Sequence, residues 1–216
     1  MRLLCISCSN VLHKKDESAS TRVCDLVKEI AQERLGSVQV ETLHLVDYDL
    51  SNCMFCGHCL EGGQCIYDDA FNQIYHKMRE SDRVIVVVPF YSVVPSKLTM
   101  IMEKVNQIYY TAWLKNPDQA FTLRGKKAAV IVHGGSVLQD NPQAQKAYQD
   151  LLLKPIVYSL TAFGFDVVGL DGDDAKGVLF GVEGYTDRDD AIFPDMVHNW
   201  ETIRDTISPL VSRLIH

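Results

Sequence analysis

The chain has 216 residues, a formal net charge of −7 and a hydrophobic fraction of 47%. This length predicts a single domain, residues 1–216, that can bury a full core. The net negative charge and the lack of a basic stripe exclude nucleic acid and anionic membranes as expected partners.

Neither a signal peptide nor a membrane span is expected. The strongest apolar run, residues 84–90, is far too short to cross a bilayer, and residues 1–10 lack the apolar core of a signal peptide. The chain has seven cysteines, an odd number. Structural disulfides are therefore not expected, and the thiols suggest metal or redox chemistry. We expect a location in the reducing cytoplasm.

Five short apolar runs alternate with amphipathic segments along the chain. The runs are typical of strands buried in a parallel sheet, and the segments have the three- and four-residue spacing of helices. The predicted strands are 2–7, 38–45, 84–88, 128–132 and 165–170. The predicted helices are 23–35, 69–79, 98–108, 142–163 with a kink or offset at Pro155, and 194–214. Residues 113–126 are interpreted as a long connection and the acidic segment 171–191 as an inserted loop.

This alternation predicts an α/β fold, a doubly wound five-stranded parallel sheet with helices on both faces. Ligands of such sheets bind beyond the carboxyl ends of the strands, where the strand order reverses. The loops 7–21, 89–95 and 133–136 all leave carboxyl ends, so we expect them to form one crevice. No G-x-G-x-x-G follows the first strand, and this favours a flavodoxin-like site over a Rossmann dinucleotide site.

Hydroxyl side chains gather before and at the start of the first predicted helix. They are Ser7, Ser9, Ser18, Ser20 and Thr21. The free N–H groups and the dipole of a helix N-terminus favour an anion, and hydroxyls add donors. Ordinary capping would need only one of them, so capping and a phosphate site both stay open.

Four cysteines form a compact motif, C-x2-C-x2-C-x5-C, and they are Cys53, Cys56, Cys59 and Cys65. Thiols at two-residue intervals can surround an iron–sulfur cube, in which each iron takes its own thiolate. A zinc ion usually takes two cysteine pairs that are farther apart, and a loop of unligated thiols is the third alternative. The spacing favours the cluster. His58 lies inside the loop, but four cysteines already complete a cube.

The cysteine motif, with Asp68-Asp69 after it and then Pro89-Phe90-Tyr91 and Lys97-Leu98, resembles the iron–sulfur flavoproteins of the NADPH-dependent FMN reductase superfamily. The resemblance extends from residue 2 to about residue 170. It implies a flavodoxin-like domain that binds FMN, and a 4Fe–4S cluster on the four cysteines that passes single electrons to or from the flavin. It also implies a homodimer or homotetramer, because in such proteins the cluster of one subunit can approach the flavin of another.

The same resemblance implies where FMN would lie. Its phosphate would lie among Ser7, Ser9, Ser18, Ser20 and Thr21. The isoalloxazine ring would be flanked by Pro89, Phe90, Tyr91, Ser92 and Val93, with His133, Gly134 and Gly135 closing the other side. The family often has Arg or Lys two residues after the first serine, where this chain has Ser9; a lysine of the inserted His13-Lys14-Lys15 would supply that charge instead.

We therefore expect an FMN-dependent oxidoreductase with a 4Fe–4S cluster. Its donor would be NAD(P)H, ferredoxin or a similar carrier, and its acceptor a quinone, oxygen, a peroxide or another protein. Two alternatives stay open: an NAD(P)H-dependent FMN or quinone reductase without a cluster, and a non-catalytic electron carrier or redox sensor. The sequence contains no interpretable catalytic triad or carboxylate pair, which suits a flavoenzyme, because the cofactor performs the chemistry.

Overall fold

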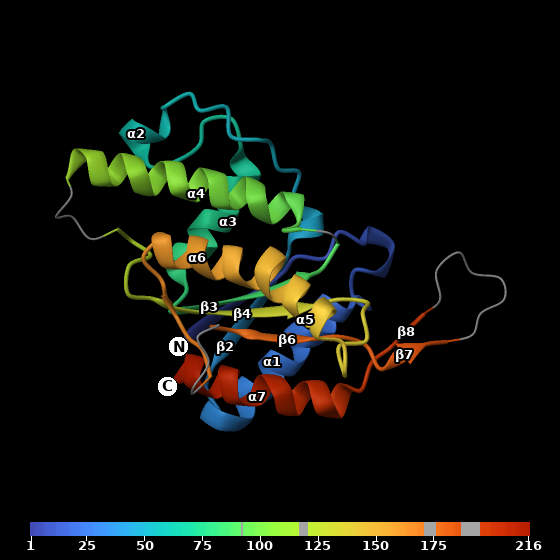
Figure 1. The fold of residues 1–216 in the computed structure, drawn as a ribbon. Coiled ribbons are helices and arrows are strands. Elements are labelled where there is room, and N and C mark those ends of the chain that lie inside the picture. The colour runs from blue at the N-terminus through green and yellow to red at the C-terminus, as the bar shows by residue number, and fades with distance from the viewer. Residues whose placement is uncertain (92, 117–120, 171–175, 187–194) are drawn as a thin grey trace.

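The computed structural model describes residues 1–91, 93–116, 121–170, 176–186 and 195–216 (Figure 1). Its main sheet has the order β2-β1-β3-β4-β5, and every pairing in it is parallel. The strands are β1 (Arg2–Ser7), β2 (Gln39–His44), β3 (Arg83–Pro89), β4 (Lys127–His133) and β5 (Asp166–Val167). The order reverses at β1, which pairs with both β2 and β3. This is the flavodoxin-like order, and it confirms the predicted fold.

Helices cover both faces of this sheet (Figure 1). On one face lie α1 (Ala19–Leu35) and α7 (Trp200–Ile215). On the other face lie α3 (Asp69–Glu80), α4 (Ser96–Lys115), α5 (Pro142–Tyr148), the π-helical segment η3 (Gln149–Leu153) and α6 (Lys154–Ala162). Short helical turns are η1 (Leu12–Lys14), η2 (Leu45–Asp47) and α2 (Cys59–Gly62).

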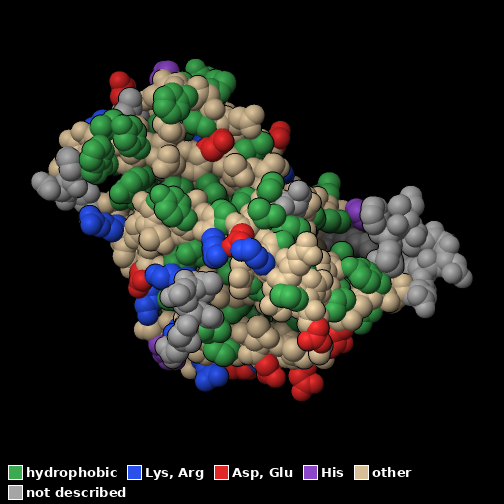
Figure 2. Space-filling view, viewed as in Figure 1, with side chains coloured by type: hydrophobic (Ala, Val, Ile, Leu, Met, Phe, Trp, Pro, Cys, Tyr) green, Lys and Arg blue, Asp and Glu red, His purple; other side chains and the backbone are tan. Residues whose placement is uncertain are grey.

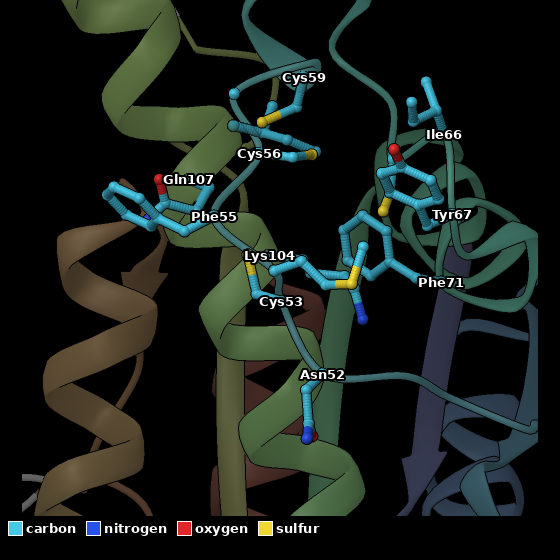
Figure 3. Close-up of a pocket in the computed structure, with 14 residues that line it drawn as sticks. Asn52, Cys53, Phe55, Cys56, Cys59, Ile66, Tyr67, Phe71, Lys104 and Gln107 are labelled. Atoms are coloured by element: carbon cyan, nitrogen blue, oxygen red, sulfur yellow. The ribbon is translucent and has the colours of Figure 1, made fainter.

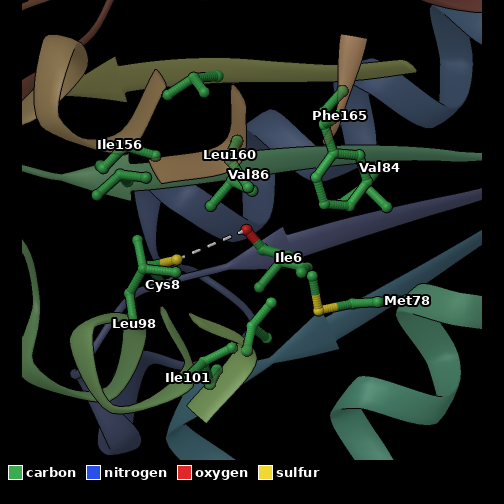
Figure 4. Close-up of a cluster of buried hydrophobic side chains, with 14 of the residues drawn as sticks. Ile6, Cys8, Met78, Val84, Val86, Leu98, Ile101, Ile156, Leu160 and Phe165 are labelled. Carbon is green, nitrogen blue, oxygen red and sulfur yellow. Dashed lines mark hydrogen bonds between the residues drawn. The ribbon is translucent and has the colours of Figure 1, made fainter. Parts of the chain in front are cut away.

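The core divides between these two faces because strand side chains alternate. Leu4 and Ile6 of β1 pack toward α3 and α4, whereas Leu3 and Cys5 pack toward α1 and α7. Figure 4 shows the first of these clusters, where Ile6, Val86 and Leu98 come together from β1, β3 and α4. Buried residues on both sides of every central strand explain why the strand sequences are continuously apolar.

Side-chain caps start the helices close to the predicted positions. Ser18 accepts a hydrogen bond from Thr21 N at the start of α1, and Asp68 accepts one from Phe71 N, 2.8 Å away, at the start of α3. Asn199 caps α7 in the same way, so the last helix begins at Trp200 rather than at residue 194. These caps satisfy N–H groups that have no partner within the helix.

One predicted helix is confirmed with its irregularity near Pro155, and another is longer than expected. The helix expected over 142–163 covers Pro142–Ala162 as α5, η3 and α6 in succession, and Pro155 lies in the first turn of α6. Because proline cannot donate to the preceding turn, the wider π-type turns of η3 come directly before it. The helix expected to end before residue 113 continues to Lys115, and residues 117–120 of the expected connection lie outside the described residues.

The fifth predicted strand, 165–170, is wrong in length. Only Asp166–Val167 pair with β4, at Lys127 and Ala128. The carboxyl half of β4 instead pairs with β6 (Val178–Phe180), which lies inside the segment interpreted as an acidic inserted loop, 171–191. Residues 171–175 and 187–191 of that segment lie outside the described residues. Farther along, β7 (Gly184–Tyr185) and β8 (Met196–Val197) form a separate antiparallel pair.

No helix in the described ranges combines the length and apolarity that crossing a bilayer requires.

Gly177 permits β6 to lie against β4. Its φ is +98°, and a Cβ there would lie 2.7 Å from Val130 O and 2.8 Å from Leu153 Cδ1.

Gly177→Ala should therefore lower the free energy of unfolding by about 2 kcal/mol or more, through backbone strain and overpacking. Denaturant unfolding measures this loss. Gly184→Ala is the control, because its Cβ would meet open space and should change stability by less than about 0.5 kcal/mol. Equal effects of the two substitutions would contradict the role given to Gly177.

Candidate functional site

The carboxyl ends of β1, β3 and β4 lie at one edge of the sheet. In the register, Ser7 lies opposite Val87, and Pro89 lies opposite His133. Backbone bonds continue past the strand ends, from Cys8 N to Val87 O (3.0 Å) and from Phe90 N to His133 O (2.6 Å). The loops 7–21, 89–95 and 133–136 therefore leave the same edge, next to the point where the strand order reverses.

Three of the predicted hydroxyls meet at the N-terminus of α1. Thr21 Oγ1 lies 3.0 Å from Ser18 Oγ and 3.5 Å from Ser7 Oγ, and it donates to Lys15 O. His44 Nδ1, at the carboxyl end of β2, lies 3.3 Å from Thr21 Oγ1. Ser9 Oγ lies apart and accepts from Val11 N. The structure thus assembles hydroxyls and one imidazole at a helix end whose dipole favours an anion.

One of the two lysines considered as a source of positive charge for this loop, Lys15, is paired with a carboxylate. Lys15 Nζ lies 2.6 Å from Asp47 Oδ2, and the hydrogen bond to this carboxylate raises the pKa of Lys15. Burial, followed by the charge of Lys15, lowers the pKa of nearby His44. Lys15 therefore lies beside the hydroxyl cluster but is paired with Asp47 of η2. The side chain of Lys14 lies outside the described atoms.

Ser20 and His133 form a separate buried contact. Ser20 Oγ lies 2.7 Å from His133 Nε2, and the imidazole stacks on Phe180 of β6 with ring centroids 5.4 Å apart. Only 6% of His133 is exposed, and burial, with a smaller effect of His198, lowers its pKa to about 3. His133 is therefore neutral at physiological pH and joins β4, α1 and β6 from beneath the loops.

The loop after β3 is held by two tyrosines. Phe90 stacks on Tyr148 of α5, with centroids 4.5 Å apart, and Tyr91 Oη accepts from Asn10 N. Tyr91 and Val93 are about half exposed, whereas Pro89 is buried as the last residue of β3. Ser92 lies outside the described residues. The expected aromatic pair is therefore divided: Phe90 packs on the core, and Tyr91 lies at the surface.

Gly134 and Gly135 have no room for a side chain, because side chains of other segments lie close to both. A Cβ on Gly134 would lie 2.2 Å from Tyr148 Oη, and one on Gly135 would lie 3.1 Å from Met196 Cε. Tyr185 Oη donates to Gly135 O, so β7 and β8 lie beside this loop. Tyr148, Tyr185 and Met196 were not expected at the site, because their positions depend on packing between segments far apart in the sequence.

The four motif cysteines line one pocket against α4 (Figure 3). All four are free thiols; Cys56 is exposed and the other three are partly buried. Burial raises the pKa of the Cys59 thiol, and the three neighbouring thiols raise it further, although a backbone hydrogen bond opposes them. Within the described residues, no three His, Cys, Asp or Glu side chains are grouped closely enough to hold a metal ion. The sulfurs therefore share a pocket without meeting at one point.

Both ends of the cysteine loop are fixed to helices. Lys104 of α4 donates to Ser51 O before the loop and lies 2.7 Å from Asp68 Oδ2 after it. Asn72 of α3 holds Cys65 twice, since its Oδ1 accepts from Cys65 N and its Nδ2 donates to Cys65 O. These contacts fix the positions of the two ends of the cysteine loop.

The chain before the loop is held by a second lysine of α4. Lys97 Nζ donates to three carbonyl oxygens, those of Leu45, Val46 and Tyr48. Sequence reasoning assigned no role to Lys97 or Lys104. The sequence did contain a signal that Lys104 is buried, because this lysine lies on the same helical face as the apolar residues Ile101, Val105 and Ile108.

Apolar side chains are exposed around the cysteine loop. Met54, Phe55, Ile66 and Tyr67 are each more than half exposed. Phe55 also has a positive φ, +52°, which is uncommon for a bulky residue. Tyr110, Trp113 and Leu114 extend the exposed apolar surface along α4, and Figure 2 shows hydrophobic side chains among scattered charges on the face that carries α4 and α6. Grouped exposed apolar side chains are typical of contact surfaces.

Residues 1–154 match the family model described as NADPH-dependent FMN reductase. The chain belongs to the NADPH-dependent FMN reductase family. This confirms the resemblance found in the sequence.

Relatives similar to this chain carry the name iron–sulfur flavoprotein. The one from Methanosarcina thermophila is 29% identical over 109 residues, covering 50% of this chain and 52% of the relative. One from Archaeoglobus fulgidus is 26% identical over 168 residues, covering 74% and 69%. In the first alignment and in that with Methanocaldococcus jannaschii, this chain spans about half the length of the relative.

Solved structures agree on the fold. An FMN-dependent NADH-azoreductase from Bacillus anthracis, in complex with FMN, has a TM-score of 0.61 at 14% identity, and the match covers 100% of both chains. The flavoenzyme NAD(P)H:(acceptor) oxidoreductase FerB from Paracoccus denitrificans has a TM-score of 0.58 at 15% identity, covering 99% of this chain and 94% of FerB. At such identities the likeness concerns the fold alone.

The buried imidazole of His133 predicts a pH dependence of stability. The unfolded chain binds a proton at this group below about pH 6.5, whereas the folded chain binds it only near pH 3. The free energy of unfolding should therefore fall as the pH is lowered through this window, by up to about 1.4 kcal/mol per pH unit, and this group should contribute no pH dependence above it.

His133→Gln keeps a side chain that can bond to Ser20 Oγ but cannot titrate. Urea unfolding of both proteins at a series of pH values measures the difference. The curve of the variant should be flatter below about pH 6.5, and parallel curves would show that His133 is not buried as a neutral group.

Proposed function

We propose that the chain is an FMN-dependent oxidoreductase, with residues 1–216 as a single FMN-binding domain. The observation that carries this proposal is the convergence of three loops at the carboxyl edge of the sheet, beside the hydroxyl-lined N-terminus of α1, in a chain of the FMN reductase family. The phosphate of FMN would be bound by Ser7, Ser18 and Thr21, with Ser9 at the edge of this group. These donors suit a phosphate that a helix dipole attracts.

The isoalloxazine ring would lie between the loop 89–93 and the loop 133–135. Tyr91 and Val93 supply exposed surface there, and the buried contacts of Phe90 with Tyr148 and of His133 with Ser20 fix the two loops from behind. In this arrangement Phe90, His133 and Ser20 act by positioning backbone. FMN supplies the redox chemistry, and the protein binds and orients it.

We also propose that the cysteine loop holds a 4Fe–4S cluster. The donor set fits, because four free thiols line one pocket and a cube takes one thiolate per iron. The relatives named iron–sulfur flavoprotein support the same group. The ligands would be Cys53, Cys56, Cys59 and Cys65, and binding requires the sulfurs to draw closer together than they are in this structure.

The proposed partners are small-molecule or protein electron donors and acceptors, with NAD(P)H as a donor. A homodimer or homotetramer would cover the exposed apolar residues around the cysteine loop and along α4. Seven free thiols in the structure suit the reducing cytoplasm proposed from the sequence.

Two other functions remain as alternatives: a reductase whose cysteine loop holds zinc or nothing, and an electron carrier or redox sensor without turnover.

Steady-state oxidation of NADH or NADPH with a quinone separates enzyme from carrier. The purified chain with bound FMN should oxidise a nicotinamide cofactor in the presence of quinone, and omission of quinone is the control. FMN binding without turnover would favour the carrier.

Anaerobically purified protein should contain one FMN, about four irons and about four sulfides per chain. Cys53→Ser should lose most of the iron and sulfide while keeping FMN, because Cys53 lies far from the hydroxyl cluster in sequence and lines the cysteine pocket. Metal analysis and the flavin absorption bands measure both groups on one sample. Cys24→Ala, which changes a buried cysteine of α1, is the matched control and should keep its iron. Iron unchanged in Cys53→Ser would contradict the assignment.

A further inference from the structure

A buried ion pair lies under the cysteine pocket. The side chains of Lys104 and Asp68 are 3% and 2% exposed, and their charged atoms are 2.7 Å apart. Burial would raise the pKa of Asp68, but hydrogen bonds from Lys104 and from two backbone N–H groups outweigh it and lower this pKa. A pair so well bonded keeps both charges out of water.

The pair is oriented toward the pocket. Lys104 lines the pocket together with all four motif cysteines, whereas Asp68 lies behind it, where it caps α3 and accepts from Ser51 N. Figure 3 shows Lys104 below Cys56 and Cys59, next to Cys53 and Phe71. The lysine side chain of the pair therefore borders the cysteine pocket, while its ammonium donates to Ser51 O and to Asp68.

We propose that Lys104 raises the reduction potential of the iron–sulfur cluster, and that Asp68 moderates this effect. The inference rests on the proposed function, since it requires a cluster on the four cysteines. A cube with four thiolate ligands is anionic and becomes more so on reduction, so a buried cation stabilises the reduced form more than the oxidised form. Ligand-neighbouring charges and hydrogen bonds tune metal centres in this way.

When bound, FMN and the cluster would supply one-electron transfer between them, in either direction, with the four cysteines holding the irons. Lys104 transfers nothing itself. It acts on the cluster through its charge and also holds the loop through Ser51 O, so potentials are compared only among variants that keep their iron and FMN.

The decisive comparison is between Asp68→Asn and the double variant Asp68→Asn/Lys104→Met. Asparagine keeps an oxygen that can cap α3, and the neutral pair avoids leaving a buried charge unpaired. The potential of Asp68→Asn should lie above that of the wild type, because an anion is removed. The potential of the double variant should lie below that of Asp68→Asn, because the cation is then removed as well.

A potentiometric titration of the full chain with both cofactors bound, followed by the EPR signal of the reduced cluster, measures these shifts. Lys97→Met is the matched control, because Lys97 also donates from α4 to backbone carbonyls, those before the cysteine loop, but does not line the cysteine pocket. Its cluster potential should stay at the wild-type value. Iron and FMN contents of every variant show whether the sites are intact.

The outcomes separate this inference from the proposed function. Wild-type protein without iron would overturn the cluster and the role of Lys104 together. Full iron with equal potentials in Asp68→Asn and the double variant would overturn the role of Lys104 alone. If the double variant binds no iron, the comparison of Asp68→Asn with the wild type decides, because a potential that stays level or falls there contradicts the proposal.

Discussion

The buried ion pair of Lys104 and Asp68 is the contact on which the geometry of the cysteine loop depends. Removing two charges from water costs several kcal/mol per ion, and only near-complete hydrogen bonding offsets that cost. Here the pair is bonded to Ser51 on one side of the loop, and Asp68 caps α3 on the other. The segment between Ser51 and Asp68, which carries the four cysteines, therefore begins and ends at one buried point. Its thiols are confined to a small volume although the loop itself contains little regular structure.

The sheet imposes a second constraint, because parallel strands bring their carboxyl ends to one edge. β1, β3 and β4 end at Ser7, Pro89 and His133 along one edge, and the strand order reverses at β1. The fifth position of the sheet is shared by β5 and β6. Through β6, Phe180 reaches His133, so the last part of the sheet contributes to the rigidity of the loop 133–135.

Much of this fold could be predicted because the signals were local. Continuous apolar runs identified β1, β3 and β4, and Ser18 and Asp68 marked helix starts as capping side chains. β6 was not predicted, because it has only three residues and is flanked by acidic sequence. It is specified by contact with β4 and by the room that Gly177 provides, which no pattern within the segment reveals.

For the candidate site too, local features could be predicted from the sequence and long-range contacts could not. The residue types and their spacing indicated hydroxyls at the first helix and thiols in one loop. The partners of those groups could not be derived from spacing: Phe90 packs on Tyr148, Ser20 bonds to His133, and each contact joins residues far apart in the chain. The sequence does not reveal which of these hydroxyls is buried and which faces the crevice, because burial depends on how α1 packs against the sheet.

Helix α4 connects the two halves of the site. It begins directly after the loop 89–95, and Lys97 in its first turn holds the chain before the cysteine loop. Lys104 follows seven residues later, which is about 10 Å along the helix axis. A helix of this length, buried along one face, keeps that separation fixed. The loop proposed to bind flavin and the pocket proposed to bind the cluster are thus attached to a single rigid element, which fixes the spacing between them.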